Sequence, residues 1–161
     1  MTTLGVKKGE MIGIHLPNIS QYPIMLAAIS KIGAIGSGIS PLLAPPEVAY
    51  QIQDAGIKVV ITLSELALVL AAMPETPNCL KYTIVTGATD LLATTGFAVP
   101  LIEDCEVLPY LDLIQSVSDE YTQTDVHWND TFMIQYTGGT TGKPKGAMLS
   151  QRNVLHNTAQ A

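Results

Sequence analysis

The sequence predicts an α/β fold in which helices cover both faces of a mostly parallel β-sheet. Two observations carry this prediction. Along residues 11–86, short apolar runs alternate with amphipathic segments, which is typical of strand–helix units joined by right-handed crossovers. The composition, with 47% hydrophobic and 14% charged residues among 161, suits one ordered domain with a packed core.

Five short apolar runs predict the strands of this sheet. Each is bounded by glycine, proline or a polar turn, and 58–62, Lys-Val-Val-Ile-Thr, has the clearest strand composition. Glycines in the second run mark places where a neighbouring backbone must pass closely. The predicted strands are 11–16, 34–39, 58–62, 81–86 and 131–136.

The first helix is predicted between Ser20 and Gly33. Ser20 is expected to cap its start, an apolar stripe at helical spacing runs from Met25 to Ile32, and Gly33 supplies the C-cap. Similar start and stop signals predict the remaining helices. They are 45–55, begun by prolines and ended by Gly56, 66–73 after a cap at Ser64, 110–116, and 151–160 after a cap at Ser150.

Residues 87–130 give weaker signals. The segment 87–96 has the composition of a loop with one helical turn. The segment 119–130 is polar and leads into the strand at 131–136. Glu103-Asp-Cys-Glu106 could be a pair of catalytic carboxylates. We favour a solvated loop there, because carboxylates are mostly exposed in proteins.

The segment Tyr136–Gly146, YTGGTTGKPKG, has the composition of a phosphate-binding loop. Its four glycines let the backbone turn sharply and direct successive N–H groups at one anion, and its threonine hydroxyls add donors that can also reach a divalent metal. Lys143 and Lys145 add positive charge. It is not a P-loop, since Thr137 stands where the first glycine belongs and Pro144 replaces Ser/Thr. A flexible Gly/Thr surface loop is the alternative.

The charge distribution has the right sign for a polyphosphate near this loop. The chain has a net charge of −6, and residues 82–142 contain nine acids but no Lys or Arg. In contrast, residues 131–161 contain no acid, and they include Lys143, Lys145 and Arg152. The overall acidity argues against nucleic acid as a partner.

No feature of the sequence predicts a zinc site, a secretory signal or a transmembrane segment. Cys79 and Cys105 have no metal-ligand spacing and suit a reducing compartment. Residues 11–30 are uncharged, but their prolines and polar side chains argue against a membrane span. We therefore expect a cytoplasmic protein, with peripheral membrane contact left open. Three histidines are expected to be structural rather than catalytic: His15, His127 and His156.

The string Tyr136–Gly146 resembles the signature of the adenylate-forming superfamily, Y-T-S/G-G-T-T-G-x-P-K-G. That superfamily includes acyl-CoA synthetases, peptide-synthetase adenylation domains and luciferases. The string matches at every position, and Gly138 makes it most similar to long-chain fatty acyl-CoA ligases of bacteria and archaea. The flanks agree at Gln135 and at 147–150, whereas Gln151 replaces a histidine of many relatives and leaves any role of that imidazole open. Weaker blocks between residues 5 and 59 agree in order and spacing.

This resemblance implies that residues 1–161 form part of the large N-terminal domain of an acyl-CoA synthetase, truncated at both ends relative to the family. It implies ATP, Mg²⁺ and CoA as reactants and cofactor, with CoA bound mainly elsewhere and the catalytic residues beyond residue 161. Lys143 occupies a variable position. The residues expected to bind the ATP phosphates are Thr137, Gly138, Gly139, Thr140, Thr141, Gly142 and Lys145, with Thr137 also on the Mg²⁺ side.

The activity implied is the ATP-dependent conversion of a carboxylic acid, most simply a fatty acid, through an acyl-adenylate to its CoA thioester. An aryl- or short-chain acid ligase is an alternative, and so is an ATP-binding module without ligase activity. A non-catalytic interaction domain is a further alternative, which the intact Thr140, Thr141, Gly142 and Lys145 disfavour. The 161 residues alone are expected to be inactive, and their oligomeric state stays open.

Overall fold

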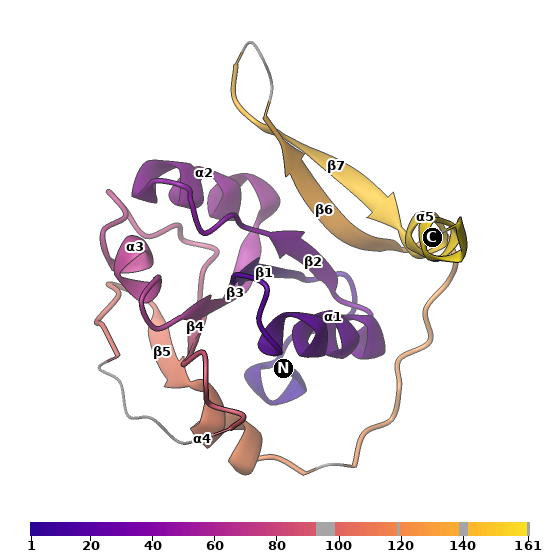
Figure 1. The fold of residues 1–161 in the computed structure, drawn as a ribbon, viewed down its shortest axis with the longest axis horizontal. Coiled ribbons are helices and arrows are strands. Elements are labelled where there is room, and N and C mark those ends of the chain that lie inside the picture. Colours follow the sequence, from indigo (N-terminus) through magenta and orange to yellow (C-terminus); the bar gives the residue numbers. More distant parts are fainter. Residues whose placement is uncertain (93–98, 119, 139–141, 161) are drawn as a thin grey trace.

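A computed structural model of the chain describes residues 1–92, 99–118, 120–138 and 142–160 (Figure 1). These residues form a seven-stranded sheet with helices on both faces, as the sequence predicts. The strands are β1 (Met11–His15), β2 (Ile35–Gly38), β3 (Ile57–Leu63), β4 (Tyr82–Thr86), β5 (Glu106–Pro109), β6 (Thr131–Thr137) and β7 (Lys145–Ser150). The helices are the 3-10 turn η1 (Thr2–Leu4), α1 (Gln21–Ile32), α2 (Pro45–Ala55), α3 (Ala67–Ala71), α4 (Tyr110–Gln115) and α5 (Gln151–Gln160).

The strand order across the sheet is β5-β4-β3-β1-β2-β6-β7. All neighbours are parallel except β6 and β7, which are antiparallel. The chain passes from β1 to β2 on one side and then returns to β3 on the other side of β1. In sheets of this kind, ligands bind at the carboxyl ends of the strands, and the loop after β6 leaves the sheet at that edge.

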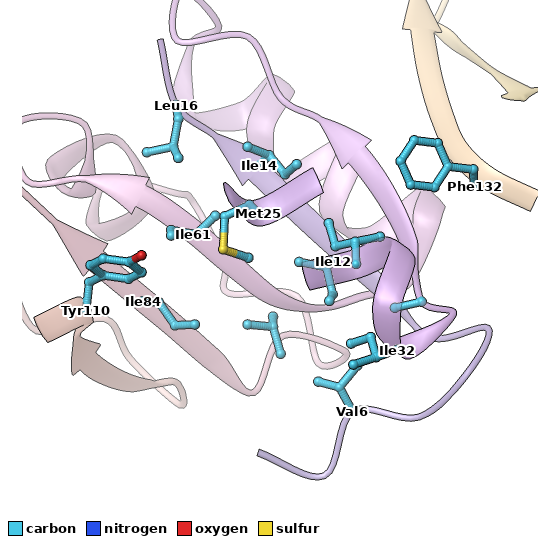
Figure 2. Packing of buried hydrophobic residues seen from close by; sticks show 13 residues of the cluster. Val6, Ile12, Ile14, Leu16, Met25, Ile32, Ile61, Ile84, Tyr110 and Phe132 are labelled. Atoms are coloured by element: carbon cyan, nitrogen blue, oxygen red, sulfur yellow. The ribbon is translucent and has the colours of Figure 1, made fainter. Parts of the chain in front are cut away.

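Two apolar cores lie on the two faces of the sheet. On one face, α1 packs Met25 and Ile29 against Ile14 and Ile61 of the strands, as Figure 2 shows in part. On the other face, α2 and α3 pack against the strands. The buried residues of this second core include Val48, Ile52, Ile57, Val60 and Leu70. A strand that is buried on both faces needs a continuous apolar sequence. This explains why the sequences of β1 and β3 clearly predicted strands.

The predicted elements agree with the structure to within two residues at most ends. The strands at 11–16, 34–39, 58–62, 81–86 and 131–136 correspond to β1, β2, β3, β4 and β6. The helix at 45–55 has the bounds of α2, and the helix at 66–73 is the shorter α3. In β2, a Cβ on Gly36 would meet side-chain atoms of Ile29 at 3.4 Å and Met133 at 3.6 Å. The backbone carbonyl oxygen of Phe132 follows at 3.7 Å, so the neighbouring strand's backbone also lies within contact distance of Gly36, as the sequence predicts.

The predicted serine caps have different outcomes. Ser20 precedes α1 with helical backbone angles and makes no side-chain cap hydrogen bond, so that prediction is wrong. The cap predicted at Ser64 is also wrong, because Ser64 Oγ donates to Glu65 and the N-cap of α3 is Leu66. The cap at Ser150 is confirmed, because the Asn153 backbone N–H donates to Ser150 Oγ at 3.2 Å while Asn153 Oδ1 accepts from the Ser150 backbone N–H.

No local pattern predicted the two edge strands, β5 and β7. Glu106 was expected in a solvated loop with Glu103, but it begins β5, where it pairs with Tyr82. β5 ends in Pro109, which an edge strand tolerates. Lys145 and Gly146, which were expected to finish the loop, begin β7. Among the described residues, no helix has both the length and the apolar character needed to span a membrane.

Candidate functional site

The hairpin of β6 and β7 carries the candidate phosphate loop. Its two strands are held by the antiparallel register that pairs Thr131 with Ser150 and Thr137 with Lys145. The hairpin lies at the edge of the sheet beyond β2 (Figure 1). The chain after Thr137 therefore leaves the sheet at the carboxyl end of β6, the edge at which the topology places ligands.

Thr137 and Lys145 face each other at the tip of this ladder. Residues directly opposite in an antiparallel pair project from the same face, so the Thr137 hydroxyl and the Lys145 ammonium group share one side of the hairpin. The Thr137 hydroxyl also lies 3.5 Å from the carbonyl oxygen of Lys145, to which it can donate. Both side chains are exposed. A hydroxyl and a cation are thus presented together to solvent.

Lys143, the other lysine of the loop, contacts helix α2. Its Nζ lies 5.1 Å from the centroid of the Tyr50 ring on α2, a cation–π distance. The structure thereby gives the two lysines of the loop different surroundings, since Lys145 is opposite Thr137 and Lys143 contacts a helix.

Among the remaining predicted residues, Gly138 is exposed, and a Cβ added to it would meet no atom within 4 Å. Gly142 has a φ of 131°, a conformation that residues with a side chain rarely adopt. Gly139, Thr140 and Thr141 lie outside the described residues.

Gly146, the last residue of the motif, is required by packing. It pairs with Tyr136 across the ladder. A Cβ on Gly146 would lie 2.5 Å from Ile134 Cγ2 and 3.4 Å from the Tyr136 ring. Any side chain would therefore displace β7 or the side chain of Ile134. The glycine allows the Tyr136 ring to lie across β7.

Two residues near the loop were not predicted from the sequence, Tyr50 and Asp54 of α2. The Tyr136 hydroxyl donates to Asp54 Oδ2 at 2.5 Å, and the Tyr50 hydroxyl donates to the Pro144 carbonyl oxygen at 3.2 Å. Burial, reinforced by the Asp54 carboxylate, raises the pKa of Tyr136 above its ordinary value. Tyr136 is therefore a hydrogen-bond donor at neutral pH. A carboxylate at the C-terminal end of a helix, where the helix dipole disfavours it, was the available signal.

His15 lies at the carboxyl end of β1, next to β3. Its Nδ1 is 3.0 Å from Thr62 Oγ1, and the side chain is fully buried. Burial lowers its pKa from 6.5 to about 4, so the ring is neutral at pH 7. The His15 side chain presents no exposed surface to a ligand, which agrees with a structural role. His127 and His156 are both exposed.

The fold places a glycine-rich hairpin at the carboxyl edge of a mostly parallel sheet, and comparison with known sequences identifies the family. All of residues 1–161 match the family described as "AMP-binding enzyme". The chain therefore belongs to that family, and the resemblance to adenylate-forming enzymes is confirmed.

Individual relatives are CoA ligases and synthetases. The long-chain-fatty-acid–CoA ligase of Salmonella typhimurium is 34% identical over 172 residues, which cover 98% of this chain and 30% of that protein. The acetyl-coenzyme A synthetase of Escherichia coli is 32% identical over 96% of this chain and 23% of that protein.

The crystal structure of the anthranilate CoA ligase AuaEII with anthranoyl-AMP superposes with a TM-score of 0.83. It is 28% identical and covers 99% of this chain and 28% of its own. The predicted fold class is thereby confirmed. The chain spans less than a third of the length of these proteins.

Proposed function

We propose that this chain is part of an ATP-dependent ligase that converts a fatty acid through an acyl-adenylate to its CoA thioester. Membership of the AMP-binding enzyme family supports the adenylation step. The identity of 34% with a long-chain-fatty-acid–CoA ligase supports a fatty acid as the substrate. Residues 1–161 would be an incomplete N-terminal domain, and other segments of a longer protein would bind adenine, the acid and CoA.

The loop after β6 would bind the β- and γ-phosphates of ATP. The observation that carries this proposal is the pairing of Thr137 with Lys145, which presents a hydroxyl and an ammonium group on one exposed face at the carboxyl edge of the sheet. Lys145 would supply the main positive charge. The other proposed phosphate contacts are the backbone N–H groups of Gly138, Gly139 and Gly142 and the hydroxyls of Thr140 and Thr141.

Fixed donors at this position would stabilise the leaving pyrophosphate. Negative charge grows on the β- and γ-phosphates as the carboxylate attacks the α-phosphorus, and donors already in place stabilise that charge without reorganising. Lys145 acts there as a cation, and the exposed Gly138 leaves open space for a phosphate oxygen to approach its backbone.

The residues present fit a magnesium ion that arrives with the nucleotide. Mg²⁺ prefers oxygen ligands and commonly binds through substrate phosphates, waters and one or two protein oxygens. Thr137 Oγ1 is an exposed oxygen of this kind on the face shared with Lys145. The ion would neutralise phosphate charge, and Thr137 would hold it on the side of the loop next to β6.

The test is acid-dependent ATP–pyrophosphate exchange by the full-length protein with short, long and aromatic carboxylic acids. Exchange with long-chain acids is the expected result. ATP binding without exchange across the whole panel would contradict the ligase and favour a binding module. Thioester formation by the 161 residues alone would contradict their proposed incompleteness.

A ligase for aryl or short-chain acids is the second candidate. The similarity to an anthranilate CoA ligase and to an acetyl-coenzyme A synthetase supports it. Exchange confined to aromatic acids or to acetate in the same panel would establish it over the fatty acid.

A further inference from the structure

Helix α2 contacts the phosphate loop at both of its ends. Before the loop, the Tyr136 hydroxyl of β6 donates to Asp54 Oδ2 at 2.5 Å. After the loop begins to return, the Pro144 carbonyl oxygen accepts from the Tyr50 hydroxyl at 3.2 Å. We propose that Tyr50 and Asp54 are positioning residues, which fix the two ends of the loop for the phosphates of ATP. This inference rests on the proposed function.

The two α2 side chains bind different parts of the hairpin and do not compete. A tyrosine hydroxyl has one proton to donate. The Tyr50 hydroxyl lies nearer to the Pro144 oxygen than to Asp54 Oδ1, at 3.2 Å against 3.5 Å. The Asp54 carboxylate therefore accepts its hydrogen bond from the Tyr136 hydroxyl, and each of the two α2 residues binds one end of the loop.

The same helix holds the side chain of Lys143. Its Nζ lies 5.1 Å from the centroid of the Tyr50 ring. A cation placed there stabilises the contact between loop and helix, and it faces α2 while Thr137 and Lys145 pair with each other. Lys143 thus belongs to the side of the loop that contacts α2. The Lys145 ammonium group has no partner among the described residues and is placed to meet a phosphate.

The position of Asp54 in α2 supports a role outside the helix. It is the next-to-last residue of Pro45–Ala55, where the negative end of the helix dipole disfavours a carboxylate. Its hydrogen bond with Tyr136 is charge-assisted, which makes it stronger than a bond between neutral groups. Asp54 therefore destabilises its own helix slightly and stabilises the contact with the hairpin.

Fixing the loop before the nucleotide arrives lowers the entropy lost on binding. The hairpin lies at the sheet edge, and the first four residues of β7 are exposed, so burial does little to hold its tip. Loss of either hydrogen bond, Tyr136–Asp54 or Tyr50–Pro144, is expected to weaken MgATP binding. It is not expected to alter binding of the acid, which the proposed function assigns to other segments.

The experiment is a double-mutant cycle in the full-length protein. Asp54→Ala, Tyr136→Phe and the double variant are compared by ATP–pyrophosphate exchange at varied MgATP. Each single variant should raise KM for MgATP about tenfold, the effect of losing one hydrogen bond to a charged group. KM for the acid should stay within about twofold, and the double variant should be no worse than either single one. Asp54→Asn, whose oxygen can still accept, should recover part of the loss.

Matched controls separate positioning from general damage. Asp112→Ala removes an exposed helical carboxylate that makes no hydrogen bond or ion pair with any described residue. Tyr82→Phe removes a hydroxyl that likewise has no described partner. Both should keep the KM for MgATP of the wild type. An unchanged KM in Asp54→Ala, additive losses in the cycle, or equal losses in the controls would overturn the proposal.

A second measurement tests the positioning role of Asp54 even if the wild type shows no pyrophosphate exchange with any acid. That result would contradict the proposed function alone. Amide hydrogen exchange of residues 135–137 and 145–147 would then be compared between wild type and Asp54→Ala. Faster exchange in the variant would support the anchor, and equal exchange would overturn it.

Discussion

The central strands and the β6–β7 hairpin differ sharply in burial. All five residues of β1 are buried, and β3 has five buried residues among seven. In β7 the first four residues are exposed, and no described residue of α5 is buried. Thr137 and Lys145, the candidate binding pair, belong to the exposed region.

The buried central strands therefore supply most of the stability of the sheet, and the exposed hairpin carries the residues proposed to bind phosphate. Burial of apolar side chains supplies most of the favourable free energy of folding, so the central strands should resist opening more than the hairpin does. A ligand loop needs donors that face solvent, which an apolar core cannot provide. The contacts from α2 compensate by holding the loop through side-chain hydrogen bonds.

The largest effect should come from removing a core side chain, and two methionines give a matched pair. Met25 on α1 is 3% exposed and Met148 on β7 is 67% exposed. Met25→Ala should lower the free energy of unfolding by about 2–5 kcal/mol, because it leaves a cavity. Met148→Ala should change it by less than about 0.5 kcal/mol. Urea denaturation of both variants measures this, and similar losses would contradict the contrast between the two regions.

The lysines of the loop test the exposed region. In the full-length protein, Lys145→Ala should reduce acid-dependent pyrophosphate exchange about a hundredfold, the usual effect of losing one fixed transition-state donor. Lys143→Ala should reduce it by less than about tenfold, since that side chain stacks on Tyr50. Both variants should unfold at the wild-type urea concentration. Equal losses, or the reverse order, would contradict the assignment of Lys145.

The buried region can be tested by the pH dependence of stability that His15 causes. Its folded pKa is about 4 against 6.5 in an ordinary environment. The unfolded state therefore binds the proton more readily, and stability is complete above about pH 7 and falls as the pH drops from 6.5 toward 4. Between pH 7.5 and pH 5 the loss should be about 2 kcal/mol.

Urea denaturation at several pH values measures this loss. The exposed His156→Gln variant should retain it, whereas His15→Gln should not show it. If His15→Gln does not fold, NMR titration of the wild type decides instead. An imidazole of His15 that takes up a proton above pH 6 would contradict the prediction.

The smallest effect compares two glycines of the motif. Gly146→Ala should lower the free energy of unfolding by about 1–2 kcal/mol, because its Cβ would lie 2.5 Å from Ile134 Cγ2 and the exposed strand can shift only partly. Gly138→Ala enters open space and should change stability by less than about 0.5 kcal/mol. Denaturation of the two variants checks this. A neutral Gly146→Ala would show that the hairpin tip yields at little cost.

Much of the fold could be predicted because local pattern and burial coincide. The run 58–62 and the stripe from Met25 to Ile32 are apolar where the core requires it. The edge strand β5 escaped prediction, because Glu106 and Pro109 have little strand preference and only pairing with β4 makes them a strand. Ser20 failed as a cap, since its backbone is already helical.

The candidate site was predictable in its composition and not in its surroundings. The glycines, threonines and lysines of 137–146 are contiguous, so their chemistry is visible in the sequence. Tyr50 and Asp54 lie more than eighty residues from the loop residues they contact, as the separations of 94 and 82 residues show. No local pattern encodes a contact over that distance.

The sequence by itself determined the α/β class, the central strands and the composition of the candidate phosphate loop, because periodicity and residue type act over a few neighbouring residues. Tertiary structure alone decided three things. It paired Lys145 with Thr137, it turned Lys143 toward α2, and it joined Asp54 to Tyr136. These depend on where the β6–β7 hairpin meets α2 in space, which is set by packing across the whole sheet.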